Sequence, residues 1–159
     1  MQEITIAHAP VMYQLNLDPE VLKYTGDDPF PSLEATTAFI QAYDQYRKYQ
    51  VGRLAVHMKD TGTCIGWCGL KYDAENDEYD VGFRFFRAYW QQGYATETAK
   101  AAIAHGFDVL QIQRIVGRAM VDNHASIRVL QKIGMQLAHA FDFDGHPGVV
   151  YEAWSTRGR

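Results

Sequence analysis

A glycine followed two positions later by a small residue stands where a strand-like run gives way to a helix-like run, in the segment Gln91-Gln92-Gly93-Tyr94-Ala95-Thr96. Glycine has no Cβ, so the backbone at Gly93 can approach an anion closely. The first N–H groups of a helix have no partner within the helix, and the positive end of the helix dipole adds to their attraction for phosphate. The segment is therefore a candidate phosphate-binding turn, although a single Gly-x-Ala is by itself more typical of a plain helix start.

Two other segments carry polar residues where a ligand could bind. Residues 80–85 form a strand-like run upstream of the turn, and residues 122–135 form a helix that begins near Asn123 and carries Ser126 one turn later. Taken together, the three segments resemble the GNAT acetyltransferase superfamily, and within it the branch of the RimJ/RimL-type ribosomal-protein N-acetyltransferases. The resemblance begins at Leu17 and runs through Met135.

The resemblance implies how acetyl-CoA would be bound. The backbone N–H groups of the turn would hold the pyrophosphate, with Trp90 standing where the superfamily often has Arg or Gln. The strand would pair with the pantetheine amides, because an exposed strand edge offers backbone donors and acceptors. Asn123 would face the cofactor, or its side chain would simply cap the helix, a contact worth about 1 kcal/mol. The expected cofactor-binding residues are Phe83, Arg84, Phe85, Gln91, Gln92, Gly93, Tyr94, Ala95, Thr96, Asn123 and Ser126.

The resemblance also indicates candidates for the catalytic acid and base. Many GNAT enzymes carry a tyrosine at the position of Leu130, where it protonates the departing thiolate, and Ser126 on the same helix side is the nearest alternative donor. A serine that only packs against a neighbouring strand explains Ser126 equally well. Deprotonating a substrate amine with a pKa of about 10 costs roughly 4 kcal/mol at pH 7, so a proton acceptor is needed. Asp80 is the leading candidate, directly or through a water, with Glu78 behind it; the alternative for Asp80 is a solvated residue at a strand end.

The elements that must position these residues follow from the spacing of apolar residues. A helix is predicted over residues 32–49, lying on a sheet, and a hairpin over residues 52–58 and 63–71 around a turn at 60–62. A strand over 79–86, a helix over 93–110, a strand over 112–120 and a helix over 123–133 follow, the last with Gly134 at its C-cap. Residues 137–143 and 149–154 are expected to form a final hairpin.

This order of elements predicts an α/β (α+β) fold, a mixed sheet with helices on its faces. The resemblance implies the GNAT fold: a mostly antiparallel sheet of six to seven strands in which the parallel strands 79–86 and 112–120 splay to admit acetyl-CoA. At 159 residues the chain is expected to be one domain, 1–159. The segment before Leu17 is short, which leaves open whether the first strand and helix are truncated.

Composition excludes several classes of partner. A net charge of −4 disfavours nucleic acid and is compatible with a cationic substrate such as an amine. No apolar run approaches the roughly 20 residues of a membrane-spanning helix, and the first residues do not resemble a signal peptide, so we expect no membrane association and a cytoplasmic location. Cys64 and Cys68 are expected on one face of a strand, about 13 Å apart, as reduced core thiols. The six histidines match no zinc spacing, so no metal is expected.

These observations predict an acetyl-CoA-dependent N-acetyltransferase, a monomer or homodimer, in which a primary amine attacks the thioester directly. A protein N-terminus and a small-molecule amine both remain open as acceptors. A rival reading is a non-catalytic acyl-CoA-binding or sensor module on the same fold. A nucleotide-binding domain is disfavoured because the sequence contains neither Gly-x-x-x-x-Gly-Lys-Ser/Thr nor Gly-x-Gly-x-x-Gly.

Overall fold

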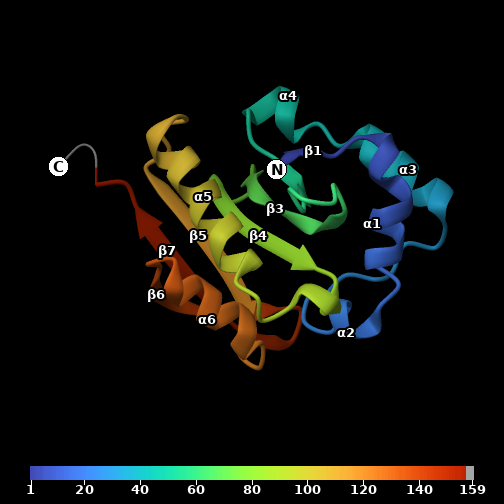
Figure 1. Cartoon of the computed structure of the whole chain (residues 1–159). Coiled ribbons are helices and arrows are strands. Elements are labelled where there is room, and N and C mark those ends of the chain that lie inside the picture. The colour runs from blue at the N-terminus through green and yellow to red at the C-terminus, as the bar shows by residue number, and fades with distance from the viewer. Residues whose placement is uncertain (157–159) are drawn as a thin grey trace.

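One seven-stranded sheet runs through the protein, with strands in the order β1-β2-β3-β4-β5-β7-β6 (Figure 1). The structure, a computed structural model, describes residues 1–156. Its elements are β1 (Gln2–Glu3), η1 (Ile6–His8), α1 (Ala9–Leu15), α2 (Pro19–Leu22), α3 (Leu33–Ala42), α4 (Gln45–Tyr49), β2 (Arg53–His57), β3 (Cys64–Asp73), β4 (Glu78–Phe85), η2 (Arg87–Tyr89), α5 (Tyr94–Asp108), β5 (Arg114–Met120), α6 (His124–Lys132), β6 (Gln136–Phe143) and β7 (His146–Trp154).

The strands β4 and β5 form the parallel pair of this sheet, as predicted, and every other neighbouring pair is antiparallel. The parallel pairing is short, since only Tyr79 with Ile115 and Asp80 with Val116 lie opposite one another. Beyond these residues each strand keeps its outer neighbour, β3 for β4 and β7 for β5, but not the other. The mixed seven-stranded sheet with splayed central strands agrees with the predicted fold class.

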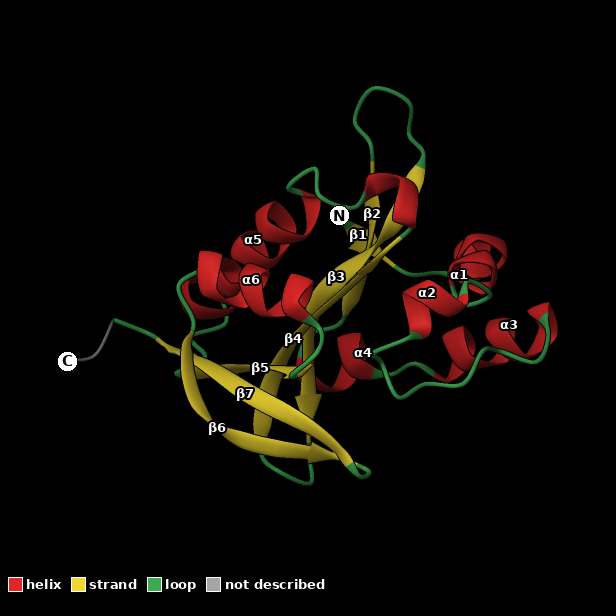
Figure 2. Ribbon diagram, turned by 90° about the horizontal axis from the view of Figure 1, so that it is seen from below, coloured by secondary structure: helices red, strands yellow, loops and turns green. Residues whose placement is uncertain are grey.

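Helices cover both faces of the sheet (Figure 2). On one face α5 and α6 lie side by side, and a core that includes Ile65, Val81 and Ile115 is buried beneath them. On the other face α1 and α3 pack together, with a smaller core around Leu15 and Ala55. The short strand β1 pairs with β2, so the segment before Leu17 supplies a first strand of two residues and a first helix. No described helix combines the length and apolar character needed to span a membrane.

The helix predicted over residues 32–49 is wrong, because the chain breaks between α3 and α4. At the break Tyr43 has an extended backbone with ψ of 111°. The Tyr43 hydroxyl accepts a hydrogen bond from the Arg53 N–H at 3.0 Å, and the Tyr46 hydroxyl donates to the Arg53 carbonyl oxygen. These contacts hold both tyrosines against the backbone of β2, a tertiary constraint that helical spacing alone does not reveal.

The expectation that Cys64 and Cys68 share one face of a strand is also wrong. In the β2–β3 pair Val56 lies opposite Gly66 and His57 opposite Cys64, so Ile65 is an extra residue in β3, a bulge. The bulge reverses the alternation of side chains. Cys68 is therefore buried beneath α5 and Cys64 packs with the core of the opposite face. Both are free thiols, and burial raises the pKa of Cys68 to about 11.

Candidate functional site

The site lies where β4 and β5 part. After Asp80 the inner edges of the two strands have no strand partner, and each strand leads into a helix, β4 into α5 and β5 into α6. The first turns of both helices thus lie beyond the carboxyl ends of two parallel strands. In open α/β sheets this edge is the usual place for ligands, because unpaired backbone groups and helix N-termini converge there.

A cavity of about 720 Å³ opens at this point. It brings together five of the residues predicted for the site, from β4 and from the start of α6: Asp80, Phe83, Arg84, Asn123 and Ser126. Two other groups of predicted residues do not border it. Phe85 is buried in the core at 5% exposure, and the turn over residues 91–96 lies outside the cavity lining.

The turn before α5 has the geometry of an anion cradle. Gln91 and Gly93 adopt positive φ angles of 58° and 88°. The backbone N–H groups from Gln91 to Thr96 donate to no acceptor within the described part of the chain. A Cβ built on Gly93 would meet no described atom within 4 Å, so the space beside this residue is open. Two side chains fix the loop, since the Trp90 Nε1–H donates to the Phe85 carbonyl and the Gln92 amide to the Ala88 carbonyl, each at 2.8 Å.

At the start of α6, Asn123 caps the helix. Its Oδ1 accepts a hydrogen bond from the Ser126 N–H at 3.2 Å, and its side chain also borders the cavity. Ser126 is half-buried, and its hydroxyl donates to no side chain or carbonyl among residues 1–156. Leu130 lies one turn further and is fully buried against Gly117, where a Cβ would stand 2.6 Å from the Leu130 Cδ2. Ser126 is therefore the hydroxyl that this helix presents to the cavity.

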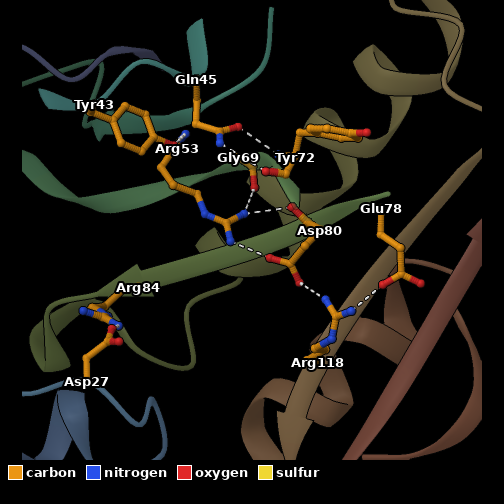
Figure 3. Close-up of polar contacts among 10 residues, drawn as sticks. All are labelled: Asp27, Tyr43, Gln45, Arg53, Gly69, Tyr72, Glu78, Asp80, Arg84 and Arg118. Carbon is orange, nitrogen blue, oxygen red and sulfur yellow. Dashed lines mark hydrogen bonds and ion pairs between the residues drawn. The ribbon is translucent and has the colours of Figure 1, made fainter. Parts of the chain in front are cut away.

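Asp80 is held between two arginines (Figure 3). Its Oδ1 lies 2.5 Å from the Arg53 Nη2, and its Oδ2 lies 3.7 Å from the Arg118 Nη1. The first contact is a charge-assisted hydrogen bond, whereas the second is longer than a hydrogen bond. Asp80 is thus not a solvated strand-end residue; its side chain is 17% exposed, and Oδ2 is its less engaged oxygen.

The neighbouring candidate Glu78 belongs to the same row of charges. It accepts hydrogen bonds from Arg118 and, at 2.6 Å, from Arg114, which also donates to Glu152 at 2.8 Å. The hydrogen bond from Arg114 lowers the pKa of Glu152 below its ordinary value. We call these six residues the charge row: Arg53, Asp80, Arg118, Glu78, Arg114 and Glu152, from β2, β4, β5 and β7.

Arg53 and Arg118 are site residues that the sequence reasoning missed. Arg53 reaches β4 because Gly69 and Gly82 lie opposite one another in the β3–β4 pair; a Cβ at Gly82 would stand 2.7 Å from the guanidinium. Its Nη1 also donates to the carbonyl oxygens of Gly69 and Asp80, at 2.6 and 2.9 Å. For Arg118 a signal was available, because charged residues are rare between buried positions of a strand, and Arg118 lies between the buried Gly117 and Ala119.

Arg84 points away from the parting strands. Its guanidinium donates to the Asn16 Oδ1 at 2.7 Å and to the Asp27 Oδ2 at 2.6 Å.

Within residues 1–156, no group of three or more His, Cys, Asp or Glu side chains is arranged to hold a metal ion.

Comparisons with known proteins agree with this geometry. Residues 1–136 match the family described as "Acetyltransferase (GNAT) domain". The chain is 30% identical over 138 residues to the uncharacterized N-acetyltransferase p20 of Bacillus licheniformis, covering 86% of this chain and 78% of that protein. Ribosomal-protein-S5-alanine acetyltransferase from Vibrio fischeri has a similar fold, with a TM-score of 0.85, 13% identity and coverage of 99% and 93%. So does spermidine N-acetyltransferase from Vibrio cholerae, solved with CoA and spermine, with a TM-score of 0.83, 13% identity and coverage of 98% and 95%.

Proposed function

The chain belongs to the GNAT acetyltransferase domain family, and on this premise we propose that it transfers the acetyl group of acetyl-CoA to a primary amine by direct attack on the thioester. One observation carries the proposal: the strands β4 and β5 part at Asp80, and a cavity at that point is bordered by residues of β4 and of the first turn of α6. A thioester delivered there would lie beside both a carboxylate and a hydroxyl.

The residues fit acetyl-CoA in three places. The open N–H groups over residues 91–96 would hold the pyrophosphate, because no acceptor within the described chain competes for them. The unpaired inner edge of β4 at Phe83, Arg84 and Phe85 would pair through its backbone with the pantetheine amides. Asn123 and Ser126 would lie at the thioester end. When bound, the cofactor supplies an acetyl group activated as a thioester.

The protein's own groups then handle the amine and its proton. Binding in the cavity would orient the amine, and backbone N–H donors aimed at the developing oxyanion are each worth several kcal/mol. Asp80 is the proposed proton acceptor, through a water on Oδ2, since Arg118 at 3.7 Å leaves that oxygen without a direct hydrogen bond. Ser126 is the proposed donor to the departing thiolate. Glu78 is a weaker candidate for the base, because both of its carboxylate oxygens accept hydrogen bonds from arginines.

The test combines a binding readout with a chemical one. Acetyl-CoA at 100 times its dissociation constant adds about 2.7 kcal/mol to the free energy of unfolding, which raises the melting temperature by several degrees. Gly93→Val should abolish this shift and leave the fold intact. Gly145→Val is a matched control, because Gly145 has φ of 89° and equally open space but lies in the β6–β7 turn. This control should keep the shift.

Release of free thiol in the presence of a mixture of amines measures the chemistry. The acyl-CoA sensor of the rival reading would show the shift in melting temperature without thiol release. If saturating acetyl-CoA causes no shift in the wild-type protein, the proposed function is wrong.

A further inference from the structure

The cavity continues from the charge row toward α3, where five aromatic rings border it. The rings come from the loop before α3, from α3 and its C-cap, and from β3: Tyr24, Phe30, Phe39, Tyr43 and Trp67. Phe30 and Phe39 contact one another with centroids 5.4 Å apart, and Phe39 and Tyr43 lie 6.2 Å apart. Phe39 borders the cavity while 55% exposed. An exposed ring in a cavity wall is a surface that an apolar ligand can bury.

Two of the carboxylates that border this cavity are paired with arginines of the protein. Two arginines, from the strands on either side of β3, place a guanidinium over the ring of Trp67. The distance to the ring centroid is 5.4 Å for Arg53 and 5.2 Å for Arg84. These two arginines in turn contact the carboxylates of Asp80 and Asp27, each pair through an ion pair of 2.5 to 2.6 Å. The cation-binding face of Trp67 and two of the carboxylates are thus occupied by the protein's own side chains.

The charged side chains that border the cavity sum to a net charge of zero. Asp27, Asp28, Asp73 and Asp80 border the cavity, and so do Arg53, Lys71, Arg84 and Arg118, four acidic and four basic residues. A polycationic acceptor would find no net negative field there, whereas burying a cation without a partner is unfavourable. A single amine is different, because it must lose its proton before attack and then carries no charge.

We propose that the acceptor is a monoamine that carries an aromatic ring. The ring would pack against Phe30 and Phe39, and the amine would lie at the Asp80 end of the cavity. This inference rests on the proposed function and names the substrate class of the same site. Aromatic contacts of this kind favour the ringed amine over an aliphatic amine of similar length by about tenfold.

The experiment measures thiol release at saturating acetyl-CoA with 2-phenylethylamine, n-butylamine and spermidine. We expect the highest kcat/KM for 2-phenylethylamine, about tenfold above n-butylamine. Phe39→Ala should bring the ratio of these two values close to one. Leu33→Ala is the control, since Leu33 is an exposed apolar residue of the same helix that does not border the cavity, and it should keep the wild-type ratio.

A second readout separates this inference from the proposed function. Calorimetric titration of 2-phenylethylamine into the protein saturated with CoA measures binding of the ring without turnover, and Phe39→Ala should weaken it about tenfold. Binding of this kind without thiol release would contradict the proposed function and support the aromatic site. Turnover that is fastest with spermidine, or a ratio that Phe39→Ala leaves unchanged, would overturn the aromatic acceptor and leave acetyl transfer standing.

Discussion

The two carboxylate oxygens of Asp80 have different surroundings, and this difference bears on its proposed role. Oδ1 is fixed by Arg53, while Oδ2 faces Arg118 at 3.7 Å, far enough to accept a hydrogen bond from a water instead. The arginines orient the carboxylate, and the remaining lone pairs can take a proton from the amine through that water. A positioning role and a proton-accepting role predict different pH dependence.

Asp80→Asn keeps the shape of the side chain and removes its charge. If Asp80 accepts the proton, turnover should fall at pH 7 and recover partly as the pH approaches the amine's own pKa, where the substrate is already neutral. A pH–rate profile of the variant is the measurement. Asp28→Asn is the control, because Asp28 borders the same cavity without an ion pair among the described residues, and its profile should match the wild type. A uniform loss at every pH would assign Asp80 to positioning.

Ser126→Ala tests the proposed proton donor to the thiolate. Turnover should fall by roughly tenfold to a thousandfold, the range for losing a catalytic donor, with little change in the affinity for acetyl-CoA. Steady-state kinetics and calorimetric titration measure the two quantities. Ser126→Thr keeps the hydroxyl and should retain much of the turnover. Unchanged turnover in Ser126→Ala would make Ser126 a structural residue.

Sequence reasoning at the scale of single residues identifies features that are local to the backbone. Gly93 and its neighbours could be named because a glycine at a helix start has a local physical meaning, and the turn has the expected open N–H groups. Arg53 could not be named, because its contact with Asp80 depends on the register of three strands and on two glycines that lie opposite each other.

At the scale of elements, the charge row joins β4 to β5 at the place where they part. Glu78 on β4 accepts hydrogen bonds from Arg114 and Arg118 on β5. These arginines lie on either side of the two β5 residues that pair with β4. These contacts hold the ends of the strands together while the following residues diverge. The width of the opening therefore depends on a carboxylate with two cationic partners.

Glu78→Gln would remove the anion shared by two half-buried guanidinium groups and leave Arg114 with Glu152 and Arg118 with the more distant Asp80. We expect the free energy of unfolding to fall by about 2 kcal/mol, the scale of a hydrogen bond to a charged group, and urea unfolding measures it. Asp44→Asn is the control, since the exposed ion pair between Asp44, at the N-cap of α4, and Lys48 should contribute little to stability. Equal losses in both variants would show that the charge row does not stabilise the junction.

The prediction of elements was accurate where local signals decide. The hairpin of β2 and β3, the strand–helix–strand unit from β4 to β5, and the final hairpin were expected, because their turns and apolar patterns lie in the elements themselves. The helix over residues 32–49 was wrong because hydroxyl contacts of Tyr43 and Tyr46 with β2 outweigh helical spacing. The bulge at Ile65 was missed although Gly66, a glycine inside the strand with a positive φ, follows it and is a typical signal for a bulge.

For the whole molecule, one buried histidine makes stability depend on pH. His8 lies beneath the N-terminal segment, accepts a hydrogen bond from the Thr5 N–H at 3.0 Å and packs 5.3 Å from the ring of His57. Burial, and then repulsion from His57, lowers the pKa of His8 below 6.5. The folded state therefore binds fewer protons than the unfolded state, and stability should fall as the pH drops through 6.5 toward the lower folded value.

His8→Asn should remove this part of the pH dependence, because an Asn Oδ1 can still accept from the Thr5 N–H but does not titrate. Urea unfolding at pH 5.5 and 7.5 measures the difference for both proteins. His146→Gln, an exposed histidine in β7, should behave as the wild type does. If the wild-type protein and His8→Asn lose the same stability between the two pH values, His8 is not the sensitive group.

The fold of the whole chain could be predicted from the order of its elements, since a strand–helix–strand unit flanked by hairpins allows few arrangements. The aromatic end of the cavity could not be predicted. Its walls are side chains from the loop before α3, from α3 and from β3, and only the folded chain brings Phe30 and Trp67 to the same hollow. The proposed acceptor site is therefore formed only by the folded molecule, whereas the proposed phosphate-binding turn is formed by consecutive residues.

The course of Arg53 over Gly69 and Gly82 restricts how this sequence can evolve. A side chain at position 82 collides with the guanidinium, and loss of Arg53 alone leaves Asp80 with only the more distant Arg118. Both changes therefore deprive Asp80 of its short contact with Arg53. Descendants of this chain that keep the pair of Arg53 and Asp80 should also keep glycine at position 82, so the three positions are expected to be retained or lost together.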